Sequence, residues 1–371
     1  MAPALREDIA RRFPLVARPK PCCHPLEARI RQVAGLIGTA TQDSPARAAT
    51  SAAQACNFAA LIASDCGLPG LARDLCHRQF LLFHAARPFD AATAKLALQP
   101  LINLGRLHAR NDDDASVLQL NDTLLTAVRH QAAACIDGTP ADFGGLTRTP
   151  DDHREVVQWL RAALLVDTTR ALAQAGRWDQ ALQYVLDHQG IAQRLLDGRQ
   201  IAIIAHYVAG AARTSADLLD QTGASAPWEA AVAASLTALT GRYLPSAALA
   251  DRYLVLGGAP QQIVFRTRLG LAILDLADGQ PDPRLAPAIE ADVLRANDAY
   301  AARDVLAHPA SASLISPSGH DALSTLLNAS GLGSGTMPPE LLDALTATTT
   351  TAEASLARAL TYMTGRAQPS V

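Results

Sequence analysis

Asparagine and arginine residues at helical spacing are the side chains in this sequence that are best suited to ligand binding. Asn103, Arg106 and Arg110 follow one another at three- and four-residue intervals, so they share one face of a helix. An asparagine amide offers a donor and an acceptor to a peptide main chain, and a guanidinium forms bidentate contacts with carboxylates. The full set of candidate ligand-binding residues is Asn103, Arg106, Arg110, His206, Tyr207, Arg266 and Arg268.

A pair of histidines supports an alternative, catalytic interpretation. His77 and His84 are seven residues apart, and Asp74 lies one turn before His77, so the three residues share a helix face. Their convergence in one deep cavity would favour an all-α enzyme or a biosynthetic accessory protein with a buried pocket. The neighbouring aromatic residues favour a structural interpretation instead, in which both histidines form local hydrogen bonds.

Cysteine and histidine in the motif PCCHP, residues 21–25, are ligands that suit zinc. Adjacent cysteines rarely bind one ion, and the sequence has no second CxxC or HxxxH to complete four ligands. The six cysteines show no paired spacing elsewhere, which is typical of reduced thiols that pack as small core residues. We therefore expect no metal, no cofactor and no disulfide framework.

The acidic motif DDHRE, residues 151–155, has the DDxxE form of a Mg²⁺ and diphosphate site in helical terpenoid synthases. The second metal motif of that family is absent. Because DDHRE follows Thr149 and Pro150 and opens a helix, we interpret its carboxylates as helix caps. The sequence also lacks GxxxxGK[ST], GxSxG and HExxH, which disfavours nucleotide binding through a standard loop.

Composition and charge exclude several other classes of protein. The formal net charge of −3 gives no general attraction for nucleic acid or anionic lipid, so we expect neither as a partner. No segment reaches the roughly 18 to 20 apolar residues that span a bilayer, and the sequence MAPALREDIARRF has no signal-peptide core. These features indicate a cytoplasmic protein.

The elements that must position the candidate residues are helices. Aromatics make up 4% of the 371 residues while Ala and Leu are abundant, which favours an all-α fold. Long helical patterns cover residues 46–65, 68–86, 90–110, 113–133, 151–175 and 178–189. We expect an arm or partial cap at 1–44, a helical array at 45–306 with a loop insertion at 137–150, and a linker with a capping helix at 307–371.

The stretch ALAQAGRWDQALQYVL, residues 171–186, indicates how these helices are paired. Gly176 lies where a left-handed helix cap is required, and Trp178, Ala181 and Val185 follow at intervals of two, three and four residues. This half-motif resembles the tetratricopeptide repeat family, although His188 replaces the small residue late in the second helix and the terminal proline is missing. Weaker repetitions occur at Gly67, at Asn111, which we expect in a positive-φ conformation, and at TGRY, residues 240–243.

The resemblance implies stacked antiparallel helical hairpins, that is, an α-solenoid with a concave face formed by the first helix of each pair. Such a face would bind a peptide, a protein segment or an acidic small ligand through the Asn and Arg side chains named above. Two alternatives stay open: the all-α enzyme or accessory protein, and a regulator that senses a ligand.

Overall fold

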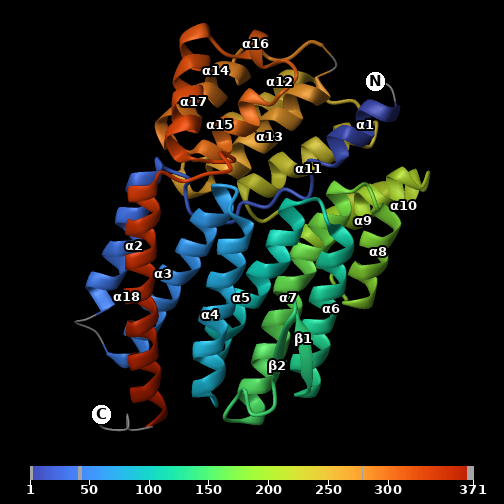
Figure 1. The fold of residues 1–371 in the computed structure, drawn as a ribbon. Coiled ribbons are helices and arrows are strands. Elements are labelled where there is room, and N and C mark those ends of the chain that lie inside the picture. Colours follow the sequence, from blue (N-terminus) through green and yellow to red (C-terminus); the bar gives the residue numbers. More distant parts are fainter. Residues whose placement is uncertain (1–2, 41–43, 278, 366–371) are drawn as a thin grey trace. The chain divides into compact units, whose positions relative to one another are not determined.

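Helices account for nearly all of the regular structure, as the abundance of Ala and Leu predicts. The structure is a computed structural model that describes residues 3–40, 44–277 and 279–365 (Figure 1). Within these ranges, the strands are those of one short two-stranded sheet. The all-α class predicted from the sequence is confirmed.

The chain divides into two compact units, each made of segments that are distant in the sequence. Unit 1 contains residues 1–25 and 168–330, and unit 2 contains residues 26–167 and 331–371. These units differ from the arm, array and cap that the sequence led us to expect. The arm is divided at residue 25, because the residues before it pack with helices after residue 168, whereas the next helix packs in unit 2.

Unit 2 consists of successive helices and one β-hairpin. Its elements are α2 (Leu26–Ala40), α3 (Pro45–Asp65), α4 (Pro69–Ala86), α5 (Ala91–Arg110), α6 (Asp114–His130), β1 (Ala133–Ile136), β2 (Thr139–Asp142), most of α7 (Pro150–Gln174) and α18 (Pro339–Thr364). Helix α7 continues beyond residue 167 into unit 1. The helices predicted at 46–65, 68–86, 90–110 and 151–175 are confirmed.

Helices α3, α5 and α7 run parallel to one another. Helix α3 contacts both α4 and α5. Polar pairs join α3 to α5 and α5 to α7 in matching order along the helices: Asn57–Asn103, Ser64–Arg110, Lys95–Glu155 and Arg106–Asp167. Because each pair advances in the same direction along both of its helices, the three helices form a parallel row in which the candidate residues of α5 lie in the middle.

The segment 137–150, which we expected to be a loop, contains half of a β-hairpin. Strands β1 and β2 pair antiparallel, with Ile136 opposite Thr139. Asp137 and Gly138 form the two-residue turn, with φ values of 49° and 83°. Asp-Gly is a preferred sequence for such turns because both residues tolerate positive φ. The strand sequences AACI and TPAD are short and lack the apolar alternation of a half-buried strand, so the sequence pattern does not reveal the hairpin.

Helix α18 closes one side of unit 2. It packs along α3 and also contacts α2 and α4 (Figure 1). Its buried residues include Leu345, Ala352 and Leu356. Four consecutive threonines at 348–351 remain helical, because each hydroxyl donates to the carbonyl four residues earlier. The helix expected near the end of the segment 307–371 is present as α18, but it packs beside α3 and does not cap the far end of an array.

Unit 1 consists of shorter helices. Its elements are α1 (Pro3–Ala10), the end of α7, α8 (Trp178–Asp187), α9 (Asp197–Val208), α10 (Ala212–Asp220), α11 (Pro227–Leu239), α12 (Ser246–Leu254), the 3₁₀-helix η1 (Pro260–Gln262), α13 (Ile263–Leu276), α14 (Leu285–Ala296), α15 (Ala299–Leu306), α16 (Ser311–Leu314) and α17 (Pro317–Ser330). The stretch 308–339, which we expected to be linker-like or weakly helical, contains helix α17.

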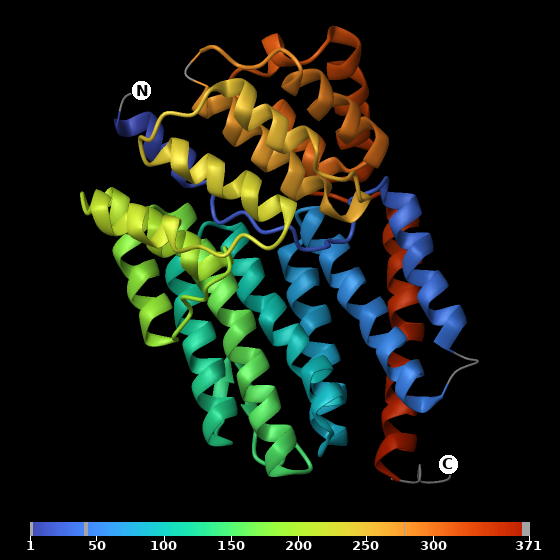
Figure 2. The same cartoon turned by 180° about the vertical axis from the view of Figure 1, so that it is seen from behind.

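Alternate helices of unit 1 also pack side by side. Helix α13 contacts α11 and α15, while α14 contacts α12 and α17. Helix α1 lies along α11 and α13 (Figure 2). The residues that follow α1 have no regular secondary structure up to Pro25 and belong to the same unit. We call residues 11–25 the strap.

Four helices end in the same hydrogen-bonded turn. Gly67, Gly176, Gly210 and Gly241 all have φ between 73° and 88°. At each turn, the amide after the glycine donates to the carbonyl five residues earlier, and the glycine amide donates three residues back. This is the Schellman arrangement that a glycine favours. The turn predicted at Gly176 is confirmed, whereas Asn111 has φ of −99° and the positive φ is found at Asp112.

Small residues follow three of these turns at the same interval. Ala72, Ala181 and Ser215 lie five residues after Gly67, Gly176 and Gly210, respectively, and all three are 0% exposed. Trp178 is also buried. The repeated glycine therefore ends one helix, and the small residue lets the next helix pack closely against its neighbours.

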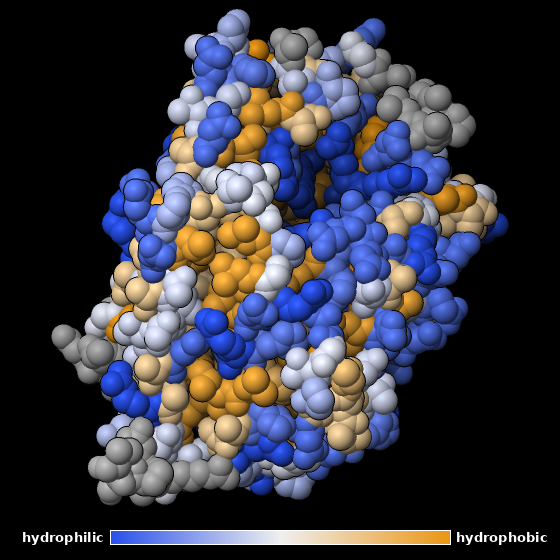
Figure 3. All heavy atoms as spheres, in the orientation of Figure 1, coloured by the Kyte–Doolittle hydropathy of each residue, from blue (hydrophilic) through white to orange (hydrophobic). Residues whose placement is uncertain are grey.

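Hydrophilic side chains cover much of the face in Figure 3, with apolar side chains exposed in the region of α4, whose Leu81 is half exposed. Of the helices that the structure describes, none combines the length and the apolar character required to cross a bilayer.

Candidate functional site

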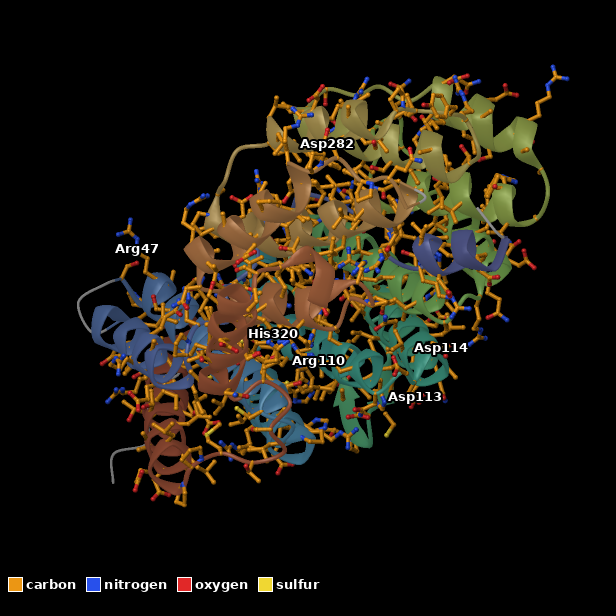
Figure 4. The ribbon with its side chains drawn as sticks, turned by 90° about the horizontal axis from the view of Figure 1, so that it is seen from above. Arg47, Arg110, Asp113, Asp114, Asp282 and His320 are labelled. Atoms are coloured by element: carbon orange, nitrogen blue, oxygen red, sulfur yellow. The ribbon has the colours of Figure 1, made fainter. Side chains whose placement is uncertain are left out.

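Three of the predicted ligand-binding residues lie together on α5. The Asn103 amide donates to Asn57 Oδ1 over 3.0 Å, and its own oxygen accepts from Arg106 over 3.2 Å and from Gln99 over 3.5 Å. Arg110 lies at the C-terminal end of the helix (Figure 4). The predicted shared face is therefore present, and it is bordered by polar residues of α3 and α7.

The guanidinium groups on this face already have carboxylate partners within the chain. Arg106 Nε donates to Asp167 Oδ2 over 2.8 Å, and Arg110 donates to Asp65 Oδ1 over 2.6 Å. Sequence spacing could not indicate this pairing, because the partners lie on other helices. Each of these arginines therefore joins α5 to a neighbouring helix, while part of its side chain stays exposed.

The other four predicted residues belong to unit 1. Arg266 is 5% exposed, and it binds the Leu256 and Gly257 carbonyls and the carboxylate of Asp292. Arg268, on the same helix, donates to Asp304 Oδ2 over 2.7 Å. His206 and Tyr207 are half-buried near the end of α9. The structure thus gives Arg266 and Arg268 different partners, and Arg266 is a core residue.

A cluster of histidines does form, but with different members from those expected. His108 Nε2 lies 2.9 Å from Asp137 Oδ1, and His77 Nε2 lies 3.7 Å from Asp137 Oδ2, which also accepts from Arg73 over 2.7 Å. His77 Nδ1 lies 3.0 Å from the Thr139 hydroxyl. Asp137 therefore holds the turn of the β-hairpin against α4 and α5. His84 binds the main chain of Asp142 instead, so the predicted His77, His84 and Asp74 site is not assembled.

Electrostatics in this cluster favour an ionised Asp137 and a neutral His77 at neutral pH. Burial works against ionisation of Asp137, but hydrogen bonds from His108 and Arg73 hold the pKa of its carboxyl below 3.8. Burial lowers the pKa of His77, against the opposing attraction of Asp137. Along the described chain, no group of three or more potential metal ligands converges in a geometry that holds an ion.

The PCCHP motif does not bring its side chains to one point. Cys22 Sγ lies 3.5 Å from the Pro260 carbonyl, His24 Nδ1 lies 2.9 Å from the Asn297 carbonyl, and Cys23 is buried. All six cysteines are free, and burial raises the pKa of Cys56 and Cys76 to about 12, so these two thiols are protonated. Four of the six are buried, as expected for core residues.

The DDHRE motif opens α7, as the sequence predicts, but the side chain that caps the helix is that of Thr149 and not one of the carboxylates. The Thr149 hydroxyl accepts from the amide of Asp152 over 3.1 Å and donates to the carboxylate of Asp152 over 2.7 Å. Asp152 also accepts from the amide of Ala91. These contacts use the carboxylate to hold the beginning of α7 against the beginning of α5.

Helices of unit 1 contact the main chain of the strap in the way that a protein contacts a bound peptide. The sequence analysis did not identify this segment as part of a site. The side-chain amide of Gln200, on α9, binds both main-chain groups of Leu15: Leu15 N donates to Oε1 and Nε2 donates to the Leu15 carbonyl, each over 2.8 Å. Gln200 is 0% exposed, and Phe13 and Leu15 are 1% and 3% exposed. Unit 1 therefore binds an extended main chain through one side-chain amide.

A buried carboxylate binds the next charged residue of the strap. Arg18 contacts Asp197 through both guanidinium nitrogens, and Arg170 lies 3.5 Å from the same carboxylate. The Asp197 side chain is 3% exposed, whereas that of Arg18 is 39% exposed. The charge preference of this site is thus for a basic residue, opposite to the acidic ligand expected from the sequence.

Main-chain hydrogen bonds continue to the end of the strap. Lys20 N donates to the Gln261 carbonyl over 2.8 Å, and Gln262 Nε2 donates to the Ala17 carbonyl over 3.3 Å. At Cys23, the amide donates to Asp298 Oδ2 and the carbonyl accepts from Ala299 N, both over 2.8 Å. The one sequence signal that fits this conformation is the set of prolines Pro14, Pro19, Pro21 and Pro25, which favour extended chain.

Comparison with known proteins adds no relative to these observations: no protein-family model, no curated protein and no solved structure matches this chain.

Proposed function

We propose that the protein is a helical-repeat scaffold that binds extended peptide segments, and that the strap occupies the peptide-binding face of unit 1. The observation that carries this proposal is the pair of hydrogen bonds between Gln200 and the main chain of Leu15. A side-chain amide that satisfies both the N–H and the C=O of one residue holds an extended chain irrespective of that residue's side chain. Such a contact suits recognition of a peptide in that conformation.

The spacing of the helix-ending turns supports a repeat architecture of the tetratricopeptide type. The turn glycines of unit 1, Gly176, Gly210, Gly241 and Gly279, all have positive φ and are separated by 34, 31 and 38 residues. The tetratricopeptide period is about 34 residues. The parallel rows of alternate helices agree with stacked antiparallel hairpins, in which each hairpin buries its apolar face against its neighbours.

The contacts also define the chemistry of the peptide. Phe13 and Leu15 supply buried apolar side chains, and Arg18 supplies the charge for Asp197. A segment of the form Phe-Pro-Leu-x-x-Arg satisfies these positions. The buried carboxylate of Asp197 makes an acidic residue unfavourable at the last position, since two like charges would be held in a site with little solvent.

A peptide of residues 11–25, labelled and added in trans, tests the proposal. The attached strap has an effective concentration in the millimolar range, so it excludes the added peptide from the wild-type protein. We expect Leu15→Ala combined with Arg18→Ala in the full-length chain to weaken the attached strap and to raise peptide affinity by about tenfold or more. Fluorescence anisotropy measures the binding.

Two controls separate peptide recognition from general loosening of the fold. Gln200→Ala, added to the strap variant, should abolish binding of the peptide. Gln183→Ala should leave binding unchanged, because the Gln183 amide contacts Asp187 on an exposed helix face. Equal binding to the strap variant with and without Gln200→Ala would contradict the proposal.

The regulator alternative is compatible with this scaffold, because a partner that displaces the strap would convert binding into a conformational signal. The enzyme alternative loses its specific support, since His77 and His84 bind different partners.

A further inference from the structure

A small cavity in unit 1 opens to solvent between the loop before η1 and the C-terminal half of α14. Its volume is about 30 Å³, and its lining includes Arg266, Arg295 and Asp292 together with Gly258 and Ala259 of the loop. Two arginines and one aspartate give the lining a net charge of +1 at neutral pH. The charge of the lining therefore suits a small anion at the mouth of the cavity.

The carboxylate of Asp292 binds both arginines and leaves part of each guanidinium unused. Its Oδ1 accepts from Arg295 over 2.8 Å, and its Oδ2 binds Arg266. The side chain of Arg295 is 67% exposed, and only its NH1 takes part in that hydrogen bond. Arg266 is 5% exposed, yet its Nε has no hydrogen-bond partner among the described residues. That atom is enclosed by the protein, so Arg266 contributes positive charge beside the cavity but no hydrogen bond from Nε.

Main-chain donors border the same space. The amides of Gly258 and Ala259 donate to no other residue in the described part of the chain. Arg295 NH1 lies 3.8 Å from the position that a Cβ on Gly258 would occupy. The open amides of the loop and the exposed guanidinium thus lie close together at the rim of the cavity, and both are groups that bind oxyanions.

We propose that this cavity is a binding site for a small oxyanion, either a phosphate or the carboxylate of a small molecule. Arg295 binds the anion at the rim with a planar pair of N–H donors, and Arg266 supplies positive charge from below. The site is separate from the peptide contacts of Gln200 and Asp197. The cavity does border the end of the strap, because Pro260 lines it and the Pro260 carbonyl lies 3.5 Å from Cys22 Sγ.

Isothermal titration of the full-length protein with sodium phosphate and with sodium acetate, at constant ionic strength maintained with sodium chloride, tests the site. The wild-type protein should bind at least one of these anions with a Kd below about 10 mM, and the comparison identifies which oxyanion the cavity prefers. Arg295→Ala should weaken that binding by about tenfold to a hundredfold, as expected for the loss of a charged hydrogen-bond donor. Arg295 is exposed, so this variant leaves the buried Arg266–Asp292 pair intact.

Arg303→Ala is the matched control, because Arg303 is an exposed arginine of unit 1 that binds Asp304 instead of lining the cavity. It should change the affinity less than twofold. Arg295→Lys should retain part of the affinity, since it keeps the charge but loses the planar pair of donors. The proposal is wrong if neither anion binds the wild-type protein below about 10 mM, or if Arg295→Ala and Arg303→Ala have the same effect.

Discussion

The guanidinium of Arg29 and the carboxylate of Asp65 form an ion pair that is almost completely excluded from solvent. Their side chains are 1% and 0% exposed, and Arg110 binds the other carboxylate oxygen over 2.6 Å. Arg29 lies on α2, Asp65 ends α3 and Arg110 ends α5. One carboxylate therefore links three helices of unit 2.

Asp65→Asn should destabilise the protein by about 3 to 5 kcal/mol, because it leaves the charge of Arg29 buried without its partner. Urea unfolding followed by circular dichroism measures the change. Arg110→Ala should lower the free energy of unfolding by about 1 kcal/mol or less. Arg110 is partly exposed, and Asp65 still forms its ion pair with Arg29 in this variant. If both variants lose a similar free energy of unfolding, the buried Arg29–Asp65 pair stabilises the protein no more than the exposed contact of Arg110 does.

Arg266→Ala and Arg106→Ala should differ strongly in stability, although we predicted the same ligand-binding role for both residues from the sequence. Arg266 is buried, and its removal leaves the Leu256 carbonyl and Asp292 without their donor, so we expect a loss of about 3 kcal/mol. The Arg106 side chain is 49% exposed, so removing it should cost no more than about 1 kcal/mol. Thermal melting of both variants distinguishes a core arginine from a surface one.

Ala181→Leu should destabilise unit 1 by about 1 to 3 kcal/mol, because Ala181 is 0% exposed and a larger side chain overpacks its surroundings. Gln180→Leu, at the exposed neighbouring position, is the control and should have little effect. If wild type and Ala181→Leu have the same melting temperature, then α8 can shift away from its neighbours without a loss of stability, which contradicts the prediction.

Stability should fall as the pH decreases through about 6.5. Burial lowers the pKa of His77, and burial together with Arg87 lowers that of His84, relative to 6.5. The unfolded chain therefore binds protons at a higher pH than the folded chain, and the free energy of unfolding decreases until the pH lies below the folded-state pKa.

Urea unfolding between pH 7.5 and 5.5 measures this slope, and the double variant His77→Gln and His84→Gln should flatten it. An unchanged slope in the double variant would assign the effect to other groups. Asp137 acts in a separate range, because its pKa lies below 3.8 and its contribution is lost only in stronger acid.

Features that depend on neighbouring residues in the sequence could be predicted, and those that depend on distant residues could not. The turn at Gly176 and the start of α7 at DDHRE need only a few consecutive residues, and both are confirmed, although Thr149 and not a carboxylate caps α7. The pairing of Arg110 with Asp65 joins residues that are 45 positions apart. Helical spacing placed Arg110 on the correct face but could not show that the face was already neutralised.

The strap illustrates the same limit for the binding site. Gln200 lies in the middle of an apolar helix, where a single polar residue carries little sequence signal, and its partner Leu15 is 185 positions away. The prolines before and after Leu15 indicated an irregular segment, which we interpreted as an arm. The buried amide of Gln200 shows why that segment is ordered against unit 1.

The packing of α18 along α3 has a consequence for synthesis on the ribosome. About 270 residues separate the end of α3 from the beginning of α18. At 5 to 20 residues per second, roughly 14 to 55 seconds pass before the partner helix is made. During that time the apolar side of α3 that receives α18 remains uncovered in the nascent chain, so unit 2 completes its core only after translation of unit 1 has finished, and a chaperone that shields apolar helices would act on the growing chain in this interval.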